Sequence, residues 1–120
     1  MRKTFIETLT ELARKDKDII LITGDLGFSV FENFATAFPK QFINCGIMEQ
    51  AMVSIAAGLA LCGKKPYVYS IIPFATMRPF EQIRNDVAYQ NANVKIVGVG
   101  TGFAYGALGS TQYAIEDIAI

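Results

Sequence analysis

Histidine does not occur in this chain, and cysteine occurs only twice. Without histidine, the chain can supply neither a histidine-based nucleophile pair nor a histidine ligand for a metal. Cys45 and Cys62 lie in apolar stretches without the spacing of metal ligands, so we expect two free, buried thiols. The chain therefore lacks the residues of a histidine-dependent hydrolase or metal site.

An excess of either charge is also missing, because 11 basic residues balance 11 acidic ones. No basic stripe indicates nucleic acid, and no apolar stretch reaches membrane-spanning length. The start of the chain has no signal-peptide pattern, so we expect a cytoplasmic protein that binds neither nucleic acid nor a membrane. Hydrophobic residues make up 52% of the chain, which favours an apolar surface that a partner covers.

Helical and strand-like patterns alternate along the chain. The helical patterns cover residues 4–15, 31–38, about 49–62 and 73 or 75 to 89, and a further one begins at Thr111. The strand-like runs are residues 19–23, 42–44, 66–70 and 94–99. This alternation predicts one α/β domain over residues 1–120, with a mostly parallel sheet sandwiched by helices. The chain stops inside the last helical pattern, so we expect the domain to be truncated or incomplete at its C-terminus.

Glu49 is the most informative single residue, because it opens a helix that is otherwise almost wholly apolar. A helix that is apolar on all sides is usually buried, and a buried carboxylate is unfavourable unless a partner group pairs with it. One interpretation is that Glu49 only complements the positive end of the helix dipole. The other is that Glu49 is a functional group with a dedicated partner.

The sequence around Glu49 carries a family resemblance. Residues 42–52, FINCGIMEQAM, followed by AAGLA at 56–60, resemble the pyrimidine-binding domain of transketolase-like enzymes. That family includes 1-deoxyxylulose-5-phosphate synthase and the β subunits of 2-oxoacid dehydrogenases. The resemblance extends over essentially the whole chain. It implies a thiamine diphosphate-binding fold in which Glu49 is catalytic and hydrogen-bonds the aminopyrimidine ring of the cofactor.

An aromatic segment gives the resemblance a second anchor. Residues 74–84, FATMRPFEQIR, match the family's run of phenylalanine, arginine, an aromatic residue, an acid and glutamine. The resemblance implies that Phe74 stacks on the aminopyrimidine ring and that Ile71 and Met77 form lesser walls of the pocket. It places Arg78 on the substrate side. The alternative is that Phe74 is an ordinary core residue, but offset stacking is a favourable way to hold a flat ring.

A glycine-rich loop follows the last predicted strand. Residues 98–102, GVGTG, superficially match a dinucleotide-binding fingerprint, but no helical pattern follows them directly. The resemblance instead identifies residues 102–111 and 116–119 as the family's substrate-side loop and the following helix. Gln112 stands where these enzymes usually carry a histidine. Glutamine can hydrogen-bond but cannot carry a proton at neutral pH, so we expect altered substrate handling.

The magnesium-binding half of the cofactor site is missing from this chain. The family holds the diphosphate through Mg²⁺, on a Gly-Asp-Gly segment followed by an asparagine pair, and residues 24–26, GDL, match it only superficially. Asp25 instead matches another family position near the cofactor. We therefore expect no metal ligands here. The resemblance implies a partner, a diphosphate-binding N-terminal subunit or domain that supplies the Mg²⁺ ligands, and the helix that opens the chain favours a separate subunit.

The function that follows is the pyrimidine-binding subunit of a thiamine diphosphate-dependent transketolase-like transferase. It would transfer a two-carbon ketol unit between sugar-type substrates and would work as a homodimer or heterotetramer. One alternative is the β subunit of a 2-oxoacid dehydrogenase, with a 2-oxoacid as the small-molecule substrate in place of a ketose. The other is a non-catalytic interaction domain that kept the fold and lost the chemistry.

Overall fold

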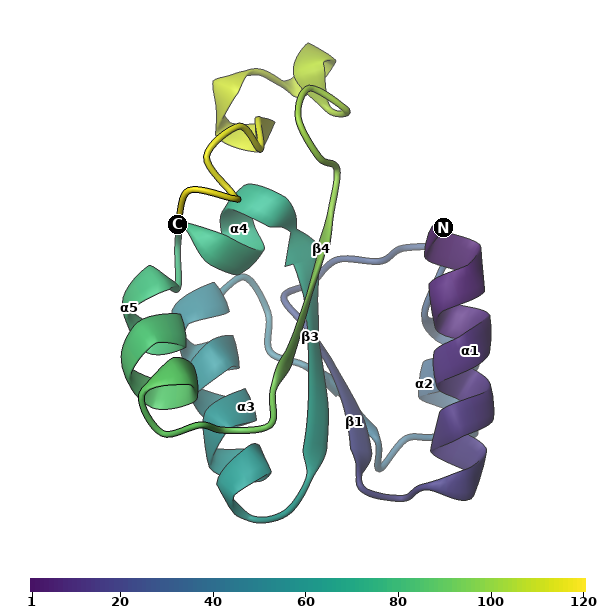
Figure 1. Cartoon of the computed structure of the whole chain (residues 1–120). Coiled ribbons are helices and arrows are strands. Elements are labelled where there is room, and N and C mark those ends of the chain that lie inside the picture. The colour runs from purple at the N-terminus through teal and green to yellow at the C-terminus, as the bar shows by residue number, and fades with distance from the viewer.

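Four parallel strands form a single sheet in the computed structural model, which describes residues 1–120 (Figure 1). The strands are β1 (Ile19–Thr23), β2 (Phe42–Asn44), β3 (Lys65–Ile71) and β4 (Lys95–Val99), and their order in the sheet is β2-β1-β3-β4. Ile22 of β1 lies beside Ile43 of β2 and Val68 of β3. The predicted α/β fold with a mostly parallel sheet is confirmed.

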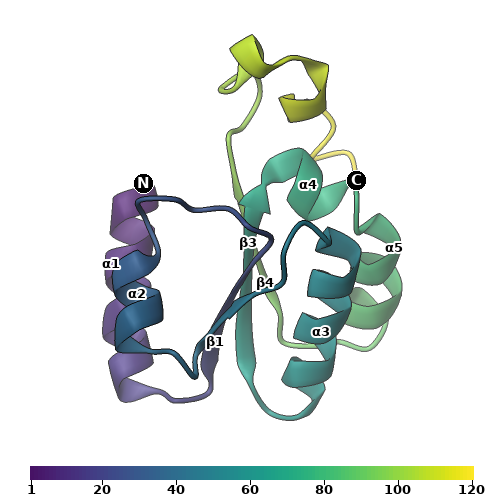
Figure 2. The same ribbon diagram turned by 180° about the vertical axis from the view of Figure 1, so that it is seen from behind.

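Helices cover both faces of this sheet. Helices α1 (Arg2–Lys15) and α2 (Glu32–Ala37) lie on one face, and α3 (Glu49–Leu61) lies on the other, beside α5 (Phe80–Gln82) (Figures 1 and 2). Helix α4 (Ile72–Thr76) follows β3 directly at the carboxyl end of the strands. None of these helices combines the length and the apolar character that crossing a bilayer would require.

The two faces of the sheet bury two separate hydrophobic clusters. Because successive side chains of a strand point to opposite faces, β1 supplies Leu21 to one cluster and Ile22 to the other. The cluster under α1 and α2 is rich in aromatic residues: Leu9, Ala13, Ile19, Leu21, Phe31, Phe34 and Tyr69. The cluster under α3 is aliphatic: Ile20, Ile22, Met52, Val53, Ala56, Ala57, Val68 and Val87. Burial on both faces explains why β1 reads as an unbroken apolar run.

The single helix predicted from residue 73 or 75 to 89 is wrong. Helix α4 ends at Thr76, a turn follows over residues 77–79, and the chain resumes as α5 and then as a π-helical turn, Ile83–Ala88. Pro79 causes the break, because proline has no N–H for the helix ladder and its ring clashes with the carbonyl four residues earlier. The bonds from Tyr89 N to Arg84 O and from Ala92 N to Val87 O, both 2.9 Å, have the i to i−5 spacing of a π-turn.

The helix predicted from Thr111 onward is also wrong. The structure has two short 3₁₀ turns instead, Gly106–Leu108 and Ser110–Gln112. Ala114 then pairs antiparallel with Gly102, which closes residues 102–114 into a loop above α4 (Figure 1). Short helices gain most of their stability from packing an apolar face, and Ile118 is 97% exposed here.

The thiols are free, as predicted, but only one of them is sheltered. Cys45 is half-buried against the aliphatic cluster, and burial raises the pKa of its thiol. Cys62 is exposed, so the prediction that both thiols are buried is wrong for this residue. Cys62 directly follows α3, in the turn through Gly63 that leads into β3, outside the hydrophobic cluster under α3.

Candidate functional site

The carboxyl ends of the strands mark the most favourable place for a ligand. From β1 the chain first continues to β2 on one side, and β3 then pairs with β1 on the other side. The order of the sheet therefore reverses at β1. Open α/β sheets bind their ligands in the crevice outside the carboxyl ends of the strands at such a point.

Glu49 lies at this crevice, as the first residue of α3. The turn from β2 into α3 passes through Gly46, whose φ of 72° suits glycine best, and Met48 N donates to Gly46 O at 2.9 Å. The Glu49 side chain is only 4% exposed. Its position at a helix N-terminus offsets part of the unfavourable energy of burying a carboxylate, but a close partner is needed as well.

Arg78 is that partner. Its Nη1 donates to both Glu49 oxygens, each at 3.1 Å, and the guanidinium carbon lies 3.8 Å from the centre of the Phe74 ring. The carboxylate comes from α3, whereas the arginine and the ring come from α4 and the turn that follows it. The Glu49–Arg78–Phe74 cluster thus joins a buried acid, a planar cation and an aromatic face. Sequence reasoning had expected Arg78 on the substrate side and had not identified it as the partner of Glu49.

Gly24 lets the end of β1 approach the acid closely. A Cβ atom at Gly24 would lie 3.3 Å from Gly46 O and 3.7 Å from Glu49 Oε1. The first of these distances is shorter than ordinary van der Waals contact, so a larger residue would push the two loops apart. The absence of a side chain at Gly24 therefore allows the end of β1 to pack directly against the Glu49 carboxylate.

Asn44 fastens the two strand ends together, and sequence reasoning missed it. Its Oδ1 accepts the backbone N–H groups of Asp25 and Gly46, each at 3.0 Å, and its Nδ2 donates to Asp25 Oδ1 at 3.1 Å. The available signal was an asparagine at the end of a strand, where its amide commonly bonds to nearby backbone. The Asp25 carboxylate is exposed and bonded to Asn44 here, at the edge of the crevice.

A cleft of about 340 Å³ separates α4 from the C-terminal loop. It brings together Phe74, Met77 and Arg78 on one side with Ser110, Thr111 and Glu116 on the other. Gln112 follows Thr111 but does not line this cleft, and its buried Oε1 has no hydrogen-bond partner. Ile71 lines a different cavity of about 240 Å³, with Phe28 and Tyr105. Of the predicted pocket walls, only Met77 therefore lies with Phe74.

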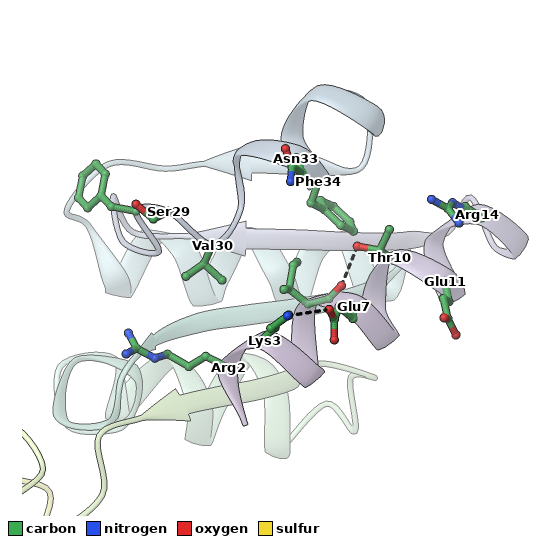
Figure 3. A pocket seen from close by; sticks show the side chains of 12 residues that line it. Arg2, Lys3, Glu7, Thr10, Glu11, Arg14, Ser29, Val30, Asn33 and Phe34 are labelled. Carbon is green, nitrogen blue, oxygen red and sulfur yellow. Dashed lines mark hydrogen bonds and ion pairs between the residues drawn. The ribbon is translucent and has the colours of Figure 1, made fainter.

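The largest hollow on the surface is elsewhere. A cavity of about 900 Å³ lies along α1 and residues 28–34, on the sheet face opposite α3 (Figure 3). Its side chains are mainly polar and exposed, and Lys3 and Glu7 pair across one helical turn at 3.9 Å. Such pairs are typical of a solvated helix face. Since this hollow contains no buried acid, we place the candidate site at Glu49.

Metal ligands do not converge anywhere in the structure. No three side chains of the cysteine, aspartate, glutamate and histidine types lie together in a way that could hold a metal ion. Near Glu49, the cation that pairs with the carboxylate is Arg78. The chemistry that this chain offers is therefore an acid that accepts hydrogen bonds, beside a flat aromatic surface.

Comparisons with known proteins show the family of this chain. The family model described as "Transketolase, pyrimidine binding domain" matches residues 1–120. An apulose-4-phosphate transketolase subunit of Phocaeicola vulgatus is 51% identical over 120 residues, which cover 99% of this chain and 38% of that protein. A putative transketolase C-terminal section of Methanocaldococcus jannaschii is 44% identical over 121 residues, which cover 100% of this chain and 38% of that protein.

A solved structure also resembles this chain in sequence and in fold. It is described as a split gene transketolase, inactive beta4 tetramer, and it superimposes with a TM-score of 0.83 at 39% identity, over 98% of this chain and 38% of that chain. The chain thus spans about 38% of the length of the curated relatives that it matches first. Because the family model matches every residue, the chain belongs to the transketolase pyrimidine-binding domain family.

Proposed function

We propose that this chain is the pyrimidine-binding part of a thiamine diphosphate-dependent, transketolase-like transferase. The reaction is the transfer of a two-carbon ketol unit between sugar-type substrates. The observation that carries the proposal is the buried Glu49 carboxylate beside the Phe74 ring, at the point where the order of the sheet reverses. Relatives named as transketolase subunits at 51% and 36% identity support the reaction class.

The residues present fit the aminopyrimidine half of thiamine diphosphate. The Arg78 guanidinium is itself flat and rich in N–H groups, and it rests on Phe74 while donating to Glu49. The crevice therefore already accommodates a flat group that donates hydrogen bonds to the acid. An aminopyrimidine ring has the same two properties, so the donor set and the aromatic platform suit it.

In the proposed reaction, Glu49 is the catalytic residue. When bound, thiamine diphosphate supplies the electron sink for making and breaking carbon–carbon bonds. Glu49 would share a proton with a ring nitrogen of the bound cofactor, and its burial would strengthen that hydrogen bond. Phe74 holds the ring by stacking, and Met77 forms one wall of the adjoining cleft. We keep Ile71 and Asp25 as lesser neighbours of the cofactor.

Gln112 is the proposed substrate-side residue. Its Oε1 is buried and has no hydrogen-bond partner, which is unfavourable unless a ligand or partner group satisfies it. Gln112 follows Thr111 of the cleft, so a substrate hydroxyl would reach this oxygen only if the loop over residues 102–114 moved, and a glutamine cannot exchange a proton with the substrate. The proposed role is therefore to orient the ketose rather than to carry its proton.

The diphosphate and its Mg²⁺ would be held by a partner subunit or domain. The proposal is supported by the lack of a metal-ligand cluster and by relatives whose names describe one subunit or a C-terminal section of a transketolase. Exposed apolar side chains along α3 and the turn before it favour a covered surface, in a homodimer or heterotetramer. They are Ile47 at 74%, Met48 at 51%, Ile55 at 42% and Leu61 at 60% exposure.

The test is reconstitution with a chain that carries the Gly-Asp-Gly magnesium segment. The complex should transfer a two-carbon unit from a ketose phosphate to an aldose phosphate only with thiamine diphosphate and Mg²⁺ present. Oxidation of a 2-oxoacid instead would identify a dehydrogenase β subunit. A complex that assembles but binds no cofactor would be a non-catalytic interaction domain. Micromolar cofactor binding by this chain alone, measured by calorimetry, would contradict the need for a partner.

A further inference from the structure

Arg78 occupies both of the contacts that the proposed cofactor ring requires. One face of Phe74 lies 3.8 Å from the guanidinium carbon, and both Glu49 oxygens accept from the same Nη1. A distance of 3.8 Å is ordinary van der Waals contact, so no second flat group fits between the guanidinium and the ring. A cofactor ring that bonds to Glu49 and stacks on this face of Phe74 therefore competes with Arg78 for one place.

We propose that Arg78 is a displaceable latch on the cofactor site. Without cofactor it holds the buried Glu49 carboxylate and covers Phe74. When the aminopyrimidine ring enters, Arg78 leaves Glu49 and turns into the adjoining cleft, where it pairs with Glu116. This inference rests on the proposed function, because it takes Glu49 and Phe74 as the seat of the ring.

The surroundings of Arg78 permit this movement. Its side chain is 45% exposed, compared with 4% for its partner Glu49, so the guanidinium already faces water on one side. The residue lies in the turn over 77–79, between α4 and α5, and its backbone N–H makes one long bond, 3.3 Å, to Pro73 O. A long side chain in such a turn can change direction without disturbing either hydrophobic cluster.

Glu116 offers the second carboxylate. It lines the cleft of about 340 Å³ together with Arg78, on the opposite wall, next to the hydroxyl groups of Ser110 and Thr111. The ion pairs of the structure involve Lys3, Lys64, Lys65 and Arg78, and none of them includes Glu116. A charged arginine that leaves Glu49 thus finds an unpaired acid within the same cleft.

The latch has a thermodynamic consequence. It lowers the free energy of the cofactor-free protein by pairing a buried acid, and the cofactor must displace that pair before it binds. A protein whose binding-competent state is only partly populated shows a correspondingly weaker apparent affinity. Arg78 therefore weakens cofactor binding while it stabilises the cofactor-free protein. A residue that simply holds the cofactor would strengthen binding instead.

The test measures cofactor affinity and thermal stability in the reconstituted complex, with Arg78→Ala as the main variant. We expect thiamine diphosphate to bind about five- to tenfold more tightly, because one partly exposed charge-assisted contact no longer has to be displaced. Without cofactor, the same variant should melt several degrees below wild type. Arg84→Ala is the matched control, since Arg84 is exposed and its side chain bonds only to the neighbouring Asn85. It should change neither value.

A second pair of variants tests whether Arg78 pairs with Glu116 after it leaves Glu49. Glu116→Gln should weaken cofactor binding a few-fold and leave the melting temperature of the cofactor-free complex unchanged. In the Arg78→Ala background the same change should have no effect, because no arginine remains to be received. Equal effects of Glu116→Gln in both backgrounds would overturn the assignment of Glu116. If Arg78→Ala does not fold, Arg78→Lys serves instead, since lysine keeps the charge but not the flat stack.

The outcomes separate this inference from the function on which it rests. If wild type and every variant bind no cofactor, the proposed function fails. If wild type binds cofactor and Arg78→Ala binds it equally or more weakly, the latch is wrong while the function stands. Millimolar guanidinium ion gives a readout independent of activity. It should raise the melting temperature of cofactor-free Arg78→Ala but not of Arg84→Ala, and equal responses of the two variants would also overturn the latch.

Discussion

The two faces of the sheet are built from different side chains and do different work. Under α1 and α2 the core is a network of rings, in which Phe31 meets Tyr69 edge-on at 4.6 Å and Phe34 lies 5.2 Å from Phe38. Under α3 the core is aliphatic, and small residues such as Ala56 let the helix lie close to the sheet. Only the α3 face includes a buried acid, Glu49. The contrast places aromatic packing on one face and the buried acid on the other.

The largest predicted effect is on the free energy of unfolding, and it tests the packing of the aromatic face. Phe34 is 1% exposed, so Phe34→Ala should lower the free energy of unfolding by about 3–5 kcal/mol through lost burial and the remaining cavity. Urea denaturation of the protein checks this. Phe28 is 75% exposed, and Phe28→Ala should stay within about 0.5 kcal/mol of wild type. A loss at Phe34 no larger than at Phe28 would mean that the buried rings of this face do not contribute to stability through their packing.

The second largest effect is on the rate of proton exchange at the cofactor, and it tests Glu49 on the α3 face. Glu49→Gln keeps the size of the side chain but cannot share its proton, so hydrogen–deuterium exchange at the thiazolium carbon should slow by about 100- to 1,000-fold, or roughly 2.7–4 kcal/mol. The melting temperature should hold or rise, because a buried charge is removed and the half-exposed Arg78 can turn to water. The measurement uses the reconstituted complex.

Glu81→Gln is the control for the second prediction, because Glu81 is an exposed acid on α5. Its exchange rate should equal that of wild type. Exchange by Glu49→Gln at the wild-type rate would return Glu49 to the simpler interpretation, a residue that only complements the helix dipole. Unfolding of Glu49→Gln would make the residue structural, and the contrast between the two faces would then fail.

The third effect concerns the ring on which the cofactor is proposed to stack. Phe74→Leu keeps an apolar side chain but removes the aromatic face, so cofactor affinity should fall by the roughly 0.5–1.5 kcal/mol that stacking adds beyond burial. Calorimetry of the reconstituted complex checks the affinity, and Phe28→Leu provides a matched loss of one phenylalanine. Unchanged affinity in Phe74→Leu would mean that Phe74 is an ordinary core residue.

Local features of the fold could be predicted from the sequence more fully than contacts between distant residues. The start of α3 at Glu49 and the bounds of β1 and β2 follow from signals within a few residues: a glycine before the helix and short apolar runs. The break after Thr76 was also within reach, since Pro79 lies in the middle of the predicted helix and proline commonly ends one. The family match across residues 74–84 identified the residue types of the site and not the shape of their backbone.

The contacts that complete the site could not be predicted in this way. Arg78 and Glu49 are 29 positions apart, and their pairing depends on how β3 places α4 beside the start of α3. The same holds for Asn44, which bridges two strand ends that are neighbours only in the folded sheet. Sequence periodicity reports which face a residue occupies, but it does not report which partner lies opposite.

The smallest predicted effect lies at the amino end of the sheet, away from the chemistry of either face. Lys65 Nζ lies 2.6 Å from Asp16 Oδ2. This hydrogen bond is the main reason why the pKa of Asp16 is lowered and the pKa of Lys65 is raised. A lowered acid pKa gives stability that is present above the unfolded value of about 3.9 and is lost as the pH falls through the folded value. A raised lysine pKa gives stability that is present below about 10.4 and is lost as the pH rises through the folded value.

Asp16→Asn tests this pair through the pH dependence of stability. Between the two pH limits the variant should be slightly less stable than wild type, and the difference should vanish as the pH falls below the folded pKa of Asp16. The effect is small because both groups are in contact with water, and added salt should reduce it further by screening. Denaturant midpoints at several pH values, at low and high salt, measure it. A difference that is independent of both pH and salt would mean that Asp16 acts through its backbone turn and not through its charge. No difference at all would mean that the hydrogen bond from Asp18 N to Asp16 Oδ1 at 2.9 Å is the contact that matters, because an asparagine would largely preserve it.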